Sequence, residues 1–414
     1  MAHLLIIELP GGNDIDILQA AIARGDQFTF VSAQLSHYKL QPAILELLTF
    51  AYEQIELNPF SYEQLEKRIL QLNSHHKIDA ILCLIDLRLV EAAKIAEKLQ
   101  LPFLNVSSAI LLRDKFNVRR ALKAKNIPQP DFRLATSNDE LKQAVDELGL
   151  PVLIKPADGY GSQNIVVLRH PEDLDPLFTP LDDMLPSRAD YGLGVMANDR
   201  LLIERFMEGT IIGCDTITQQ GVHQLLGVNE KLFFAPPSFA IRGGVFTPNN
   251  GQFKQIEQYL FALLDAVNFN CGATHTEMII TAEGLQLVEI NARLVGAKIP
   301  RIINYALERS IHNDLIDLHL GKIITTTSIH HKKISASRWI VTDEAGTLEN
   351  IQLPTEKIEH ICMVDIVKKI GDKVKPPYEN VDRIGCVMAC ADSIDDCNLA
   401  LDSYMSQLKL FINP

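Results

Sequence analysis

The chain has 414 residues, of which 47% are hydrophobic and 22% are charged, and this composition is typical of a globular protein with a large core. Lys and Arg total 39 and Asp and Glu total 52, so the formal net charge is −13. Nucleic acids and anionic membranes both select clustered positive charge, so neither is expected as the main partner. No apolar run reaches the ~18 residues of a membrane span, and no signal peptide is apparent. We therefore expect a cytoplasmic enzyme.

Residues 1–110 alternate between short apolar segments and amphipathic helices. The segments 4–9, 28–31 and 80–85 are predicted strands, and a helix is predicted over 89–99. This alternation is typical of a parallel, doubly wound sheet, and it indicates an N-terminal α/β domain. The turn after the first strand lacks the G-x-G-x-x-G fingerprint, so the pattern does not favour dinucleotide binding there.

The rest of the chain is predicted to form three further units, so the fold class is α/β, and α+β in part. Residues 111–200 combine helices with a strand that leads into a glycine-bearing loop, and residues 201–321 carry strands, a long helix over 252–267 and a hairpin over 274–293. Residues 322–414 are β-rich and close on a helix. Seven cysteines lie along the chain without any C-x-x-C pair, so we expect reduced, mostly buried thiols and no metal site built from cysteine.

Lys115, Lys155 and the loop 158–163 form the first candidate site. Lys155 ends the apolar strand 152–155, so its ammonium projects from a rigid element beside Gly159 and Gly161. Glycines permit backbone conformations in which the N–H groups turn toward an anion. The arrangement therefore suits phosphate, although it is not a Walker A sequence. A solvated lysine before an ordinary hairpin is the alternative.

The hairpin over 274–293 carries the second candidate site. If residues 282–284 form a three-residue turn with Gly284 left-handed, residues 281 and 285 pair. Glu277 then faces Glu289 and His275 faces Asn291, and all four side chains share one face because strand side chains alternate. The other face, with Met278, Ile280, Gln286, Val288 and Ile290, is then expected to supply the core. These residue types come directly from the sequence.

Two carboxylates directly opposite each other repel, by up to ~1 kcal/mol. A like-charge pair with an added amide, such as Glu277, Glu289 and Asn291, makes sense when a divalent cation lies between them. Oxygen ligands of this kind suit Mg²⁺. A register that is slipped by one residue, with one carboxylate in solvent, is the alternative. A third segment, the apolar strand 201–209, can place Glu204, Phe206 and Met207 beside a flat heterocycle, although by itself it is an ordinary strand.

Together and in this order, these motifs resemble those of the ATP-grasp superfamily, and most nearly its carboxylate–amine ligases of the L-amino-acid ligase (dipeptide synthase) type. The resemblance implies an ATP-grasp fold that follows an N-terminal, Rossmann-like pre-ATP-grasp domain. It is strong from about residue 100 to residue 321 and extends to the tail. The matching segments are 114–115, 152–156, the glycine loop, 204–209, 274–277 and 289–293.

The resemblance also implies roles for the residues of these motifs. Two lysines would hold the phosphates of ATP, Arg293 would steady the acyl phosphate, and the carboxylate pair with Asn291 would bind Mg²⁺, with Mn²⁺ as an alternative metal. The expected metal ligands are Glu277, Glu289 and Asn291, and the expected catalytic residues are Arg293 and Lys155. The expected nucleotide contacts are Lys115, Lys155, Asp158, Gly159, Tyr160, Gly161, Ser162, Glu204, Arg205, Phe206, Met207 and Asp215. The expected substrate contacts are His275, Arg242, Gly296 and Ala297.

The sequence departs from the family pattern at two places. Residues 210–212 are apolar where many relatives carry a Glu, and Val245 stands where some dipeptide ligases place a His. The resemblance implies an ADP-forming ligase that joins a carboxylate to an amine, with small-molecule substrates and a homodimeric assembly. An ATP-dependent carboxylase that acts through carboxyphosphate and a non-catalytic nucleotide sensor are the alternatives. No activated Ser or Cys is needed for this chemistry, and the chain has no G-x-S-x-G.

Overall fold

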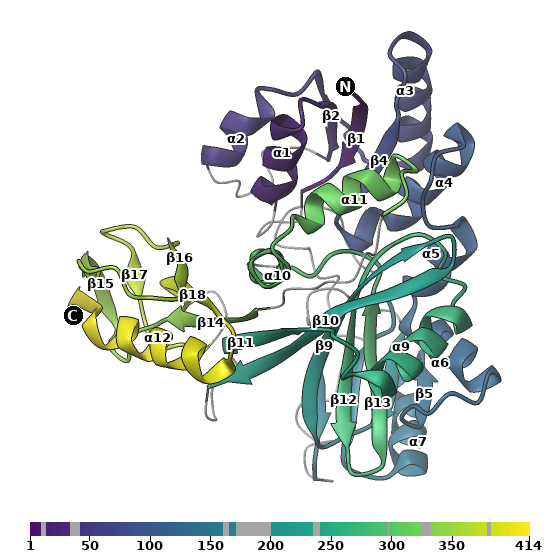
Figure 1. Ribbon diagram of the computed structural model, residues 1–414. Coiled ribbons are helices and arrows are strands. Elements are labelled where there is room, and N and C mark those ends of the chain that lie inside the picture. The colour runs from purple at the N-terminus through teal and green to yellow at the C-terminus, as the bar shows by residue number, and fades with distance from the viewer. Residues whose placement is uncertain are drawn as a thin grey trace.

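The computed structural model describes residues 1–9, 14–33, 42–159, 165–170, 200–234, 241–296, 298–324, 333–378 and 382–414. Within these ranges no helix has the length and apolar character needed to cross a membrane. Figure 1 shows an N-terminal domain beside a long curved sheet, with the C-terminal segment at the far end of that sheet. All seven cysteines are free thiols and five of them are buried, which confirms the expectation of unpaired, mostly buried cysteines.

The N-terminal domain is a parallel four-stranded sheet in the order β3-β2-β1-β4. The apolar segments of the sequence form β1, β2 and β4, because strands covered on both faces bury nearly all of their side chains. The edge strand β3 has the polar sequence EQIE, was not predicted, and buries only Ile55. The strands are β1 (His3–Ile7), β2 (Gln27–Ser32), β3 (Glu53–Glu56) and β4 (Ala80–Cys83), and the helices are α1 (Asp14–Ala23), α2 (Pro42–Leu48), α3 (Tyr62–His75) and α4 (Leu89–Leu99). The parallel α/β prediction for this region is therefore confirmed.

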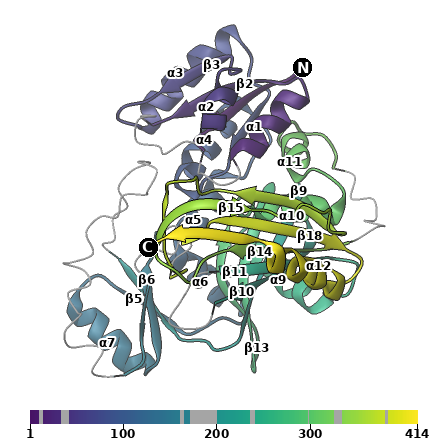
Figure 2. The same ribbon diagram turned by 90° about the vertical axis from the view of Figure 1, so that its left-hand side faces the viewer.

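A second, smaller sheet has the strand order β5-β8-β6-β7 and is covered by α7. We expected a domain boundary at residue 200, but β8 pairs with β5 and β6, so this sheet extends beyond that boundary. Figure 2 shows the small sheet with α7 at one side of the molecule. The elements are α5 (Val106–Leu112), α6 (Lys115–Ala124), β5 (Phe132–Ala135), α7 (Asn138–Leu148), β6 (Val152–Pro156), β7 (Val166–Leu168) and β8 (Leu201–Arg205).

The central sheet has eight strands in the order β13-β12-β9-β10-β11-β14-β18-β16. It joins residues on both sides of position 321, where we expected a second boundary, because β11 pairs with β14. Its strands are β9 (Thr210–Gln219), β10 (Val222–Phe233), β11 (Ile241–Pro248), β12 (Gly272–Thr281), β13 (Gly284–Asn291), β14 (Ile334–Ile340), β16 (Ile361–Ile366) and β18 (Gly385–Ala391). A small sheet of β17 (Lys373–Val374), β15 (Gly346–Gln352) and β19 (Lys409–Asn413) and the helix α12 (Ile394–Gln407) complete the C-terminal segment.

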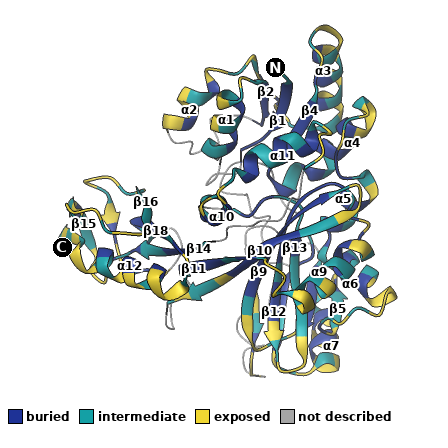
Figure 3. Cartoon of the chain, in the orientation of Figure 1, coloured by how far each residue is buried: buried dark blue, intermediate teal, exposed yellow. Residues whose placement is uncertain are grey.

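The central sheet packs on helices on both faces. On one face, Ile212 and Met278 share a core with Leu260 of α9 (Lys254–Ala266). On the other face, α10 (Ile299–Leu307) packs on β11, β14 and β18, and α11 (Ile311–His319) packs on α1 and β4. In Figure 3, dark blue marks the buried residues on the strands of the central sheet and on α11, which lies between that sheet and the N-terminal domain. The face under α10 also carries the polar residues described next.

Candidate functional site

The hairpin of β12 and β13 brings the expected carboxylates together. Glu277 pairs with Glu289 and His275 pairs with Asn291, so the register predicted for these residues is confirmed. The predicted turn is wrong, because Thr281 pairs with Gly284 and the loop has only two residues. A β-bulge next to Glu277 adds one residue on β13, and this compensates for the shorter loop.

The bulge changes which side chains of β13 face the core. Met278 pairs with Leu287, and both are buried, so Leu287 enters the core where we expected Val288. Gln286 pairs with Ile279, so by strand alternation it lies on the same face as Glu277. Ile280, which we also expected in the core, is 44% exposed. One extra residue therefore turns Gln286 toward the site.

A lysine contacts each of the two carboxylates. Lys231 Nζ lies 2.5 Å from Glu277 Oε1, and Lys115 Nζ lies 3.0 Å from Glu289 Oε1. Burial raises the pKa of Glu277, but His275 and Lys231 outweigh this effect and hold the pKa well below its ordinary value. The two ammonium groups therefore compensate the repulsion that we expected between the carboxylates.

The cross-strand contacts of Glu277 depend on a glycine. Glu277 pairs with Gly213 of β9, and Gly213 pairs with Asn229 of β10. A Cβ atom on Gly213 would lie 2.4 Å from Cε1 of His275, so the imidazole occupies the space that a side chain would fill. Because position 213 has no side chain, the ammonium of Lys231 on β10 reaches across β9 to Glu277. Lys231 was not foreseen from the sequence, because β10 also carries Asn229 and Glu230 and nothing in its pattern singles out the lysine.

His275 and Asp215 form a buried pair beside the carboxylates. His275 Nδ1 lies 2.9 Å from Asp215 Oδ1, and Nε2 lies 3.6 Å from Glu277 Oε1. Burial lowers the pKa of His275, but Asp215 and Glu277 more than offset this, so its pKa is raised. The imidazole thus links Asp215, which we expected to contact the nucleotide, to the carboxylate pair.

Lys155 lies in a buried ionic cluster with Glu204 and Arg119. Glu204 accepts hydrogen bonds from Arg119 Nε at 2.5 Å and pairs with Lys155 Nζ at 2.7 Å. All three side chains are nearly inaccessible to solvent. Burial raises the pKa of Glu204, but the two cations outweigh it and hold the pKa at about 2. Burial lowers the pKa of Lys155, and Glu204 opposes this shift.

The same cluster holds the bulge of β13. Arg119 donates to the carbonyl oxygens of Leu287 and Val288 at 2.8 and 3.1 Å, and Lys155 Nζ lies 3.5 Å from the oxygen of Val288. From the resemblance we expected Glu204 to contact adenine. Its two carboxylate oxygens are instead engaged by Arg119 and Lys155, so its position is that of a residue that orients these cations.

Lys115 and Gly159 connect the small sheet to the carboxylates. Lys115 begins α6, which Asp114 caps by accepting from the Asn117 N–H. Its Nζ donates to the Gly159 oxygen at 2.6 Å as well as contacting Glu289. Of the expected glycine loop, Asp158 and Gly159 are described, whereas Tyr160, Gly161 and Ser162 lie outside the described residues.

Arg293 joins the hairpin to the N-terminal domain. Its Nε donates to Asp86 Oδ2 at 2.6 Å, and one terminal nitrogen lies 3.4 Å from Asn291 Oδ1. Asp86 begins a short 3₁₀ turn shortly after β4. Ligands of parallel α/β sheets bind at the carboxyl ends of the strands, and this rule could have identified Asp86 from the sequence. Of the remaining substrate candidates, Arg242 is exposed on β11 and Gly296 follows the hairpin. Ala297 lies outside the described residues.

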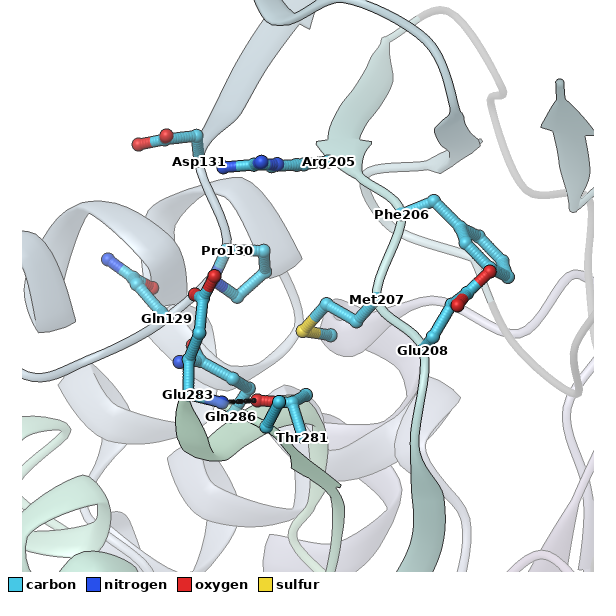
Figure 4. A pocket seen from close by; sticks show the side chains of 11 residues that line it. Gln129, Pro130, Asp131, Arg205, Phe206, Met207, Glu208, Thr281, Glu283 and Gln286 are labelled. Carbon is cyan, nitrogen blue, oxygen red and sulfur yellow. Dashed lines mark hydrogen bonds between the residues drawn. The ribbon is translucent and has the colours of Figure 1, made fainter.

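A cavity of ≈250 Å³ lies beside the turn of the hairpin. In Figure 4, Met207 points toward Pro130 and Gln286, whereas Phe206 points to the other side. Gln129 Nε2 donates to the Arg119 oxygen at 2.7 Å, which fixes its amide. The Oε1 atoms of Gln129 and Gln286 are buried and have no hydrogen-bond partner in the described part of the chain. The lining residues are Gln129, Pro130, Asp131, Arg205, Phe206, Met207, Glu208, Thr281, Ala282, Glu283 and Gln286.

The donor set of the hairpin fits Mg²⁺. Glu277 and Glu289 pair directly, and Asn291 follows on the same face of β13, so two carboxylates and one amide oxygen are available from adjacent strands. These are hard oxygen ligands, and Mg²⁺ completes such a set with water and phosphate oxygens. Among the described residues, no group of three or more His, Cys, Asp or Glu side chains could hold a metal ion, so this candidate site depends on the amide of Asn291 as its third ligand.

Comparison with known proteins identifies two domains. Residues 148–301 match the model of the ATP-grasp domain, and residues 338–412 match L-amino acid ligase C-terminal domain 2. The chain is 23% identical to the L-arginine-specific L-amino acid ligase of Bacillus subtilis, over 64% of this chain and 64% of that protein. It is 24% identical to dapdiamide A synthase of Enterobacter agglomerans, over 68% of this chain and 67% of that protein. The matches thus span about two thirds of the length of these relatives.

The solved structures agree with these matches at the level of the fold. The crystal structure of L-amino acid ligase from Bacillus licheniformis superposes with a TM-score of 0.77 at 18% identity, and it covers 100% of this chain and 99% of that chain. The fold and the two domain matches define an ATP-grasp protein. Within that superfamily, the chain is similar to proteins of the L-amino acid ligase type.

Proposed function

We propose that this protein is an ATP- and Mg²⁺-dependent ligase that joins a carboxylate, in the family an amino acid, to an amine and releases ADP and phosphate. The observation that carries the proposal is the placement of Glu277, Glu289 and Asn291 on the face of the hairpin that also presents Gln286 to the cavity. A nucleotide with its base in the cavity can direct its phosphates toward the carboxylates along the same strands.

The chemistry follows from the groups around the hairpin. A carboxylate is a poor acyl donor, and transfer of the γ-phosphoryl group of ATP to it gives an acyl phosphate. Attack of the amine on the carbonyl carbon then expels phosphate. The protein supplies positive charge and positioning: Lys155 and Lys115 neutralise phosphate oxygens, and Arg293, held by Asp86 at 2.6 Å, faces the acyl group. Glu277, Glu289 and Asn291 would hold Mg²⁺, which would neutralise charge on the phosphates when bound.

The nucleotide product is expected to be ADP. The lysines described above and the proposed Mg²⁺ ligands are suited to γ-phosphoryl transfer, since they compensate the charge of the transferred phosphoryl group. Chromatography of the nucleotides after incubation with ATP, Mg²⁺ and a mixture of amino acids measures this. Accumulation of AMP and pyrophosphate would contradict the acyl-phosphate mechanism and favour adenylation. Release of ADP that requires bicarbonate but no amine would favour a carboxylase.

The base preference is expected to depend on Gln129. Its unpartnered Oε1 is an acceptor and suits the exocyclic amine of adenine, whereas guanine presents a carbonyl at that position. Gln129→Met removes the acceptor and keeps the length of the side chain. We expect the preference for ATP over GTP, measured as the ratio of kcat/KM values, to fall about tenfold or more. Gln143→Met, on the exposed side of α7, is the matched control, and an unchanged ratio in Gln129→Met would place the base elsewhere.

We also propose that the protein is cytoplasmic and forms a homodimer. Free thiols at all seven cysteines agree with a reducing compartment such as the cytoplasm. The resemblance to amino acid ligases supports small-molecule substrates and a homodimer, and sedimentation velocity of the purified protein tests the homodimer.

A further inference from the structure

A second cavity, of ≈150 Å³, lies between the central sheet and α10. One cross-strand row forms its floor, with Lys231 opposite Gly244, Gly244 opposite Ser337 and Ser337 opposite Met388. Gly244 and Ser337 are the small members of this row, and they leave the space that larger side chains would fill. The walls include Ile302 of α10 and the two residues Trp339 and Cys386, which pair with each other on the next row.

This cavity ends at the proposed phosphoryl-transfer centre. Lys231 lines the cavity, and its Nζ lies 2.5 Å from Glu277 Oε1. Asn229 also lines the cavity. It pairs with Gly213, and Gly213 pairs with Glu277, so Asn229 and Glu277 lie in the same cross-strand row. A molecule in the cavity therefore has one end beside Glu277 and the other end against Trp339.

The polar groups of the cavity select an anionic head group. Asn229 is 1% exposed, and its Nδ2 donor has no partner among the described residues, so it lacks the acceptor that a buried donor requires. Lys231, Lys298 and Arg383 are the charged residues of the lining, and all three are basic. Lys231 is paired with Glu277 at 2.5 Å and Lys298 with Asp365 at 2.8 Å, so the group that still needs an acceptor is the Asn229 amide, and a carboxylate beside it supplies one. The described lining contains no acidic residue, so a positively charged side chain would find no counter-ion there.

The remaining lining selects an apolar body of limited size. Ile299, Ile302, Trp339 and Met388 face the cavity, and Arg383 stacks on the Trp339 ring with its Cζ atom 3.8 Å from the ring centroid. An apolar cavity of about 150 Å³ holds a molecule of the size of benzene. A branched aliphatic group or a single six-membered ring therefore fits.

We propose that this cavity binds the acid that is activated, and that it selects a carboxylic or amino acid with an uncharged apolar side chain no larger than a phenyl ring. Its carboxylate lies at Asn229 and Lys231, where the phosphoryl group arrives, and its side chain lies against Trp339 and Ile302. This inference rests on the proposed function for the identity of the reacting group. The selection by size and charge rests on the cavity alone.

The first test uses hydroxylamine as the amine, because it converts any acyl phosphate to a hydroxamate with release of phosphate. Alanine, leucine, phenylalanine, lysine and arginine are compared as the acid, with hydroxamate and ADP measured. We expect kcat/KM for leucine and phenylalanine to exceed the values for lysine and arginine by about tenfold or more. A preference for lysine or arginine would overturn the inference while leaving the ligase function intact.

The second test fills the cavity. Ser337→Leu is expected to raise KM for leucine and phenylalanine about tenfold or more, with a much smaller effect on alanine and none on the affinity for Mg²⁺-ATP. Ser406→Leu, the same substitution at an exposed position of α12, is the control. If Ser337→Leu is poorly folded, which the melting temperature and ATP affinity report, Trp339→Leu replaces it and is expected to admit acids larger than phenylalanine. Equal loss for all acids, or no loss for any, would contradict the proposal.

Binding by calorimetry separates the two proposals. Leucine and lysine are titrated into the wild-type protein with ADP and Mg²⁺ present. Binding of leucine that is weakened by Ser337→Leu supports the cavity assignment even without turnover, whereas tighter binding of lysine rejects it. Absence of hydroxamate with every acid would reject the ligase function, and the calorimetric result would still decide the cavity.

Discussion

Replacing Glu289 by Gln is expected to lower the rate of ADP formation on the order of 10²-fold or more, since an electrostatic group at a reaction centre has an effect of this size. Glu289 faces Glu277 across the hairpin and contacts Lys115 at 3.0 Å. The substitution removes one charge from the proposed Mg²⁺ ligands and frees Lys115, but it keeps the shape of the side chain. The rate is measured at several Mg²⁺ concentrations.

The control for this experiment lies on the same hairpin. Glu283 is exposed in the two-residue loop, so Glu283→Gln changes the net charge equally and leaves the carboxylate pair intact. We expect Glu283→Gln to retain wild-type rates and both variants to melt near the wild-type temperature. A Glu289→Gln variant that remains fully active at limiting Mg²⁺ would show that this carboxylate does not hold the metal.

Replacing Glu204 by Ala is expected to lower the free energy of unfolding by about 3–5 kcal/mol, because it leaves two buried cations without their counter-ion. Arg119 and Lys155 both contact Glu204, and they also hold the carbonyl groups of the bulge. Urea unfolding monitored by circular dichroism measures the change. Glu208→Ala, at an exposed position four residues further on, serves as control and is expected to unfold like the wild type.

The same cluster predicts a specific acid sensitivity. The pKa of Glu204 is lowered from 4.5 to about 2 in the folded protein, so its contribution to stability is fully present above pH 4.5. That contribution is lost as the pH falls from 4.5 toward about 2. In Glu204→Ala the urea midpoint is expected to depend less steeply on pH in this window than in the wild type. An identical slope in both proteins would show that Glu204 does not form the ion pairs in solution.

The hairpin shows which features of the candidate site could be predicted from the sequence and which could not. An expected three-residue turn placed Glu277 opposite Glu289, and the structure confirms that pairing because the bulge offsets a loop that is one residue shorter. The shorter loop and the bulge were not predictable from the hairpin sequence, because the bulge is held by Arg119 and Lys155, which are distant in sequence. Gln286 was therefore assigned to the wrong face.

Other parts of the site were missed for related reasons. Lys231 contacts Glu277 because Gly213 on the intervening strand β9 has no side chain, and the sequence around Lys231 does not indicate which glycine lies on the neighbouring strand. Gln129 lies in a loop, and its side-chain amide is oriented by a hydrogen bond to the Arg119 carbonyl oxygen. That contact is not apparent from the sequence. In contrast, β1, β2 and β4 of the N-terminal sheet were predictable, because strands buried on both faces appear as continuous apolar segments. The edge strand β3 is a polar segment and was not predicted.

The pairing of β11 with β14 limits how enzymes of this architecture can be recombined. Gly243 and Gly244 pair with Arg338 and Ser337, so a cut at residue 321 would divide one hydrogen-bonded sheet rather than separate two modules. A Cβ atom on Gly243 would lie 2.2 Å from the Ser337 oxygen, which makes the junction intolerant of mismatched partners. A chimaera that imports a foreign C-terminal segment must therefore import β11 with it, and the walls of the second cavity are inherited as a unit.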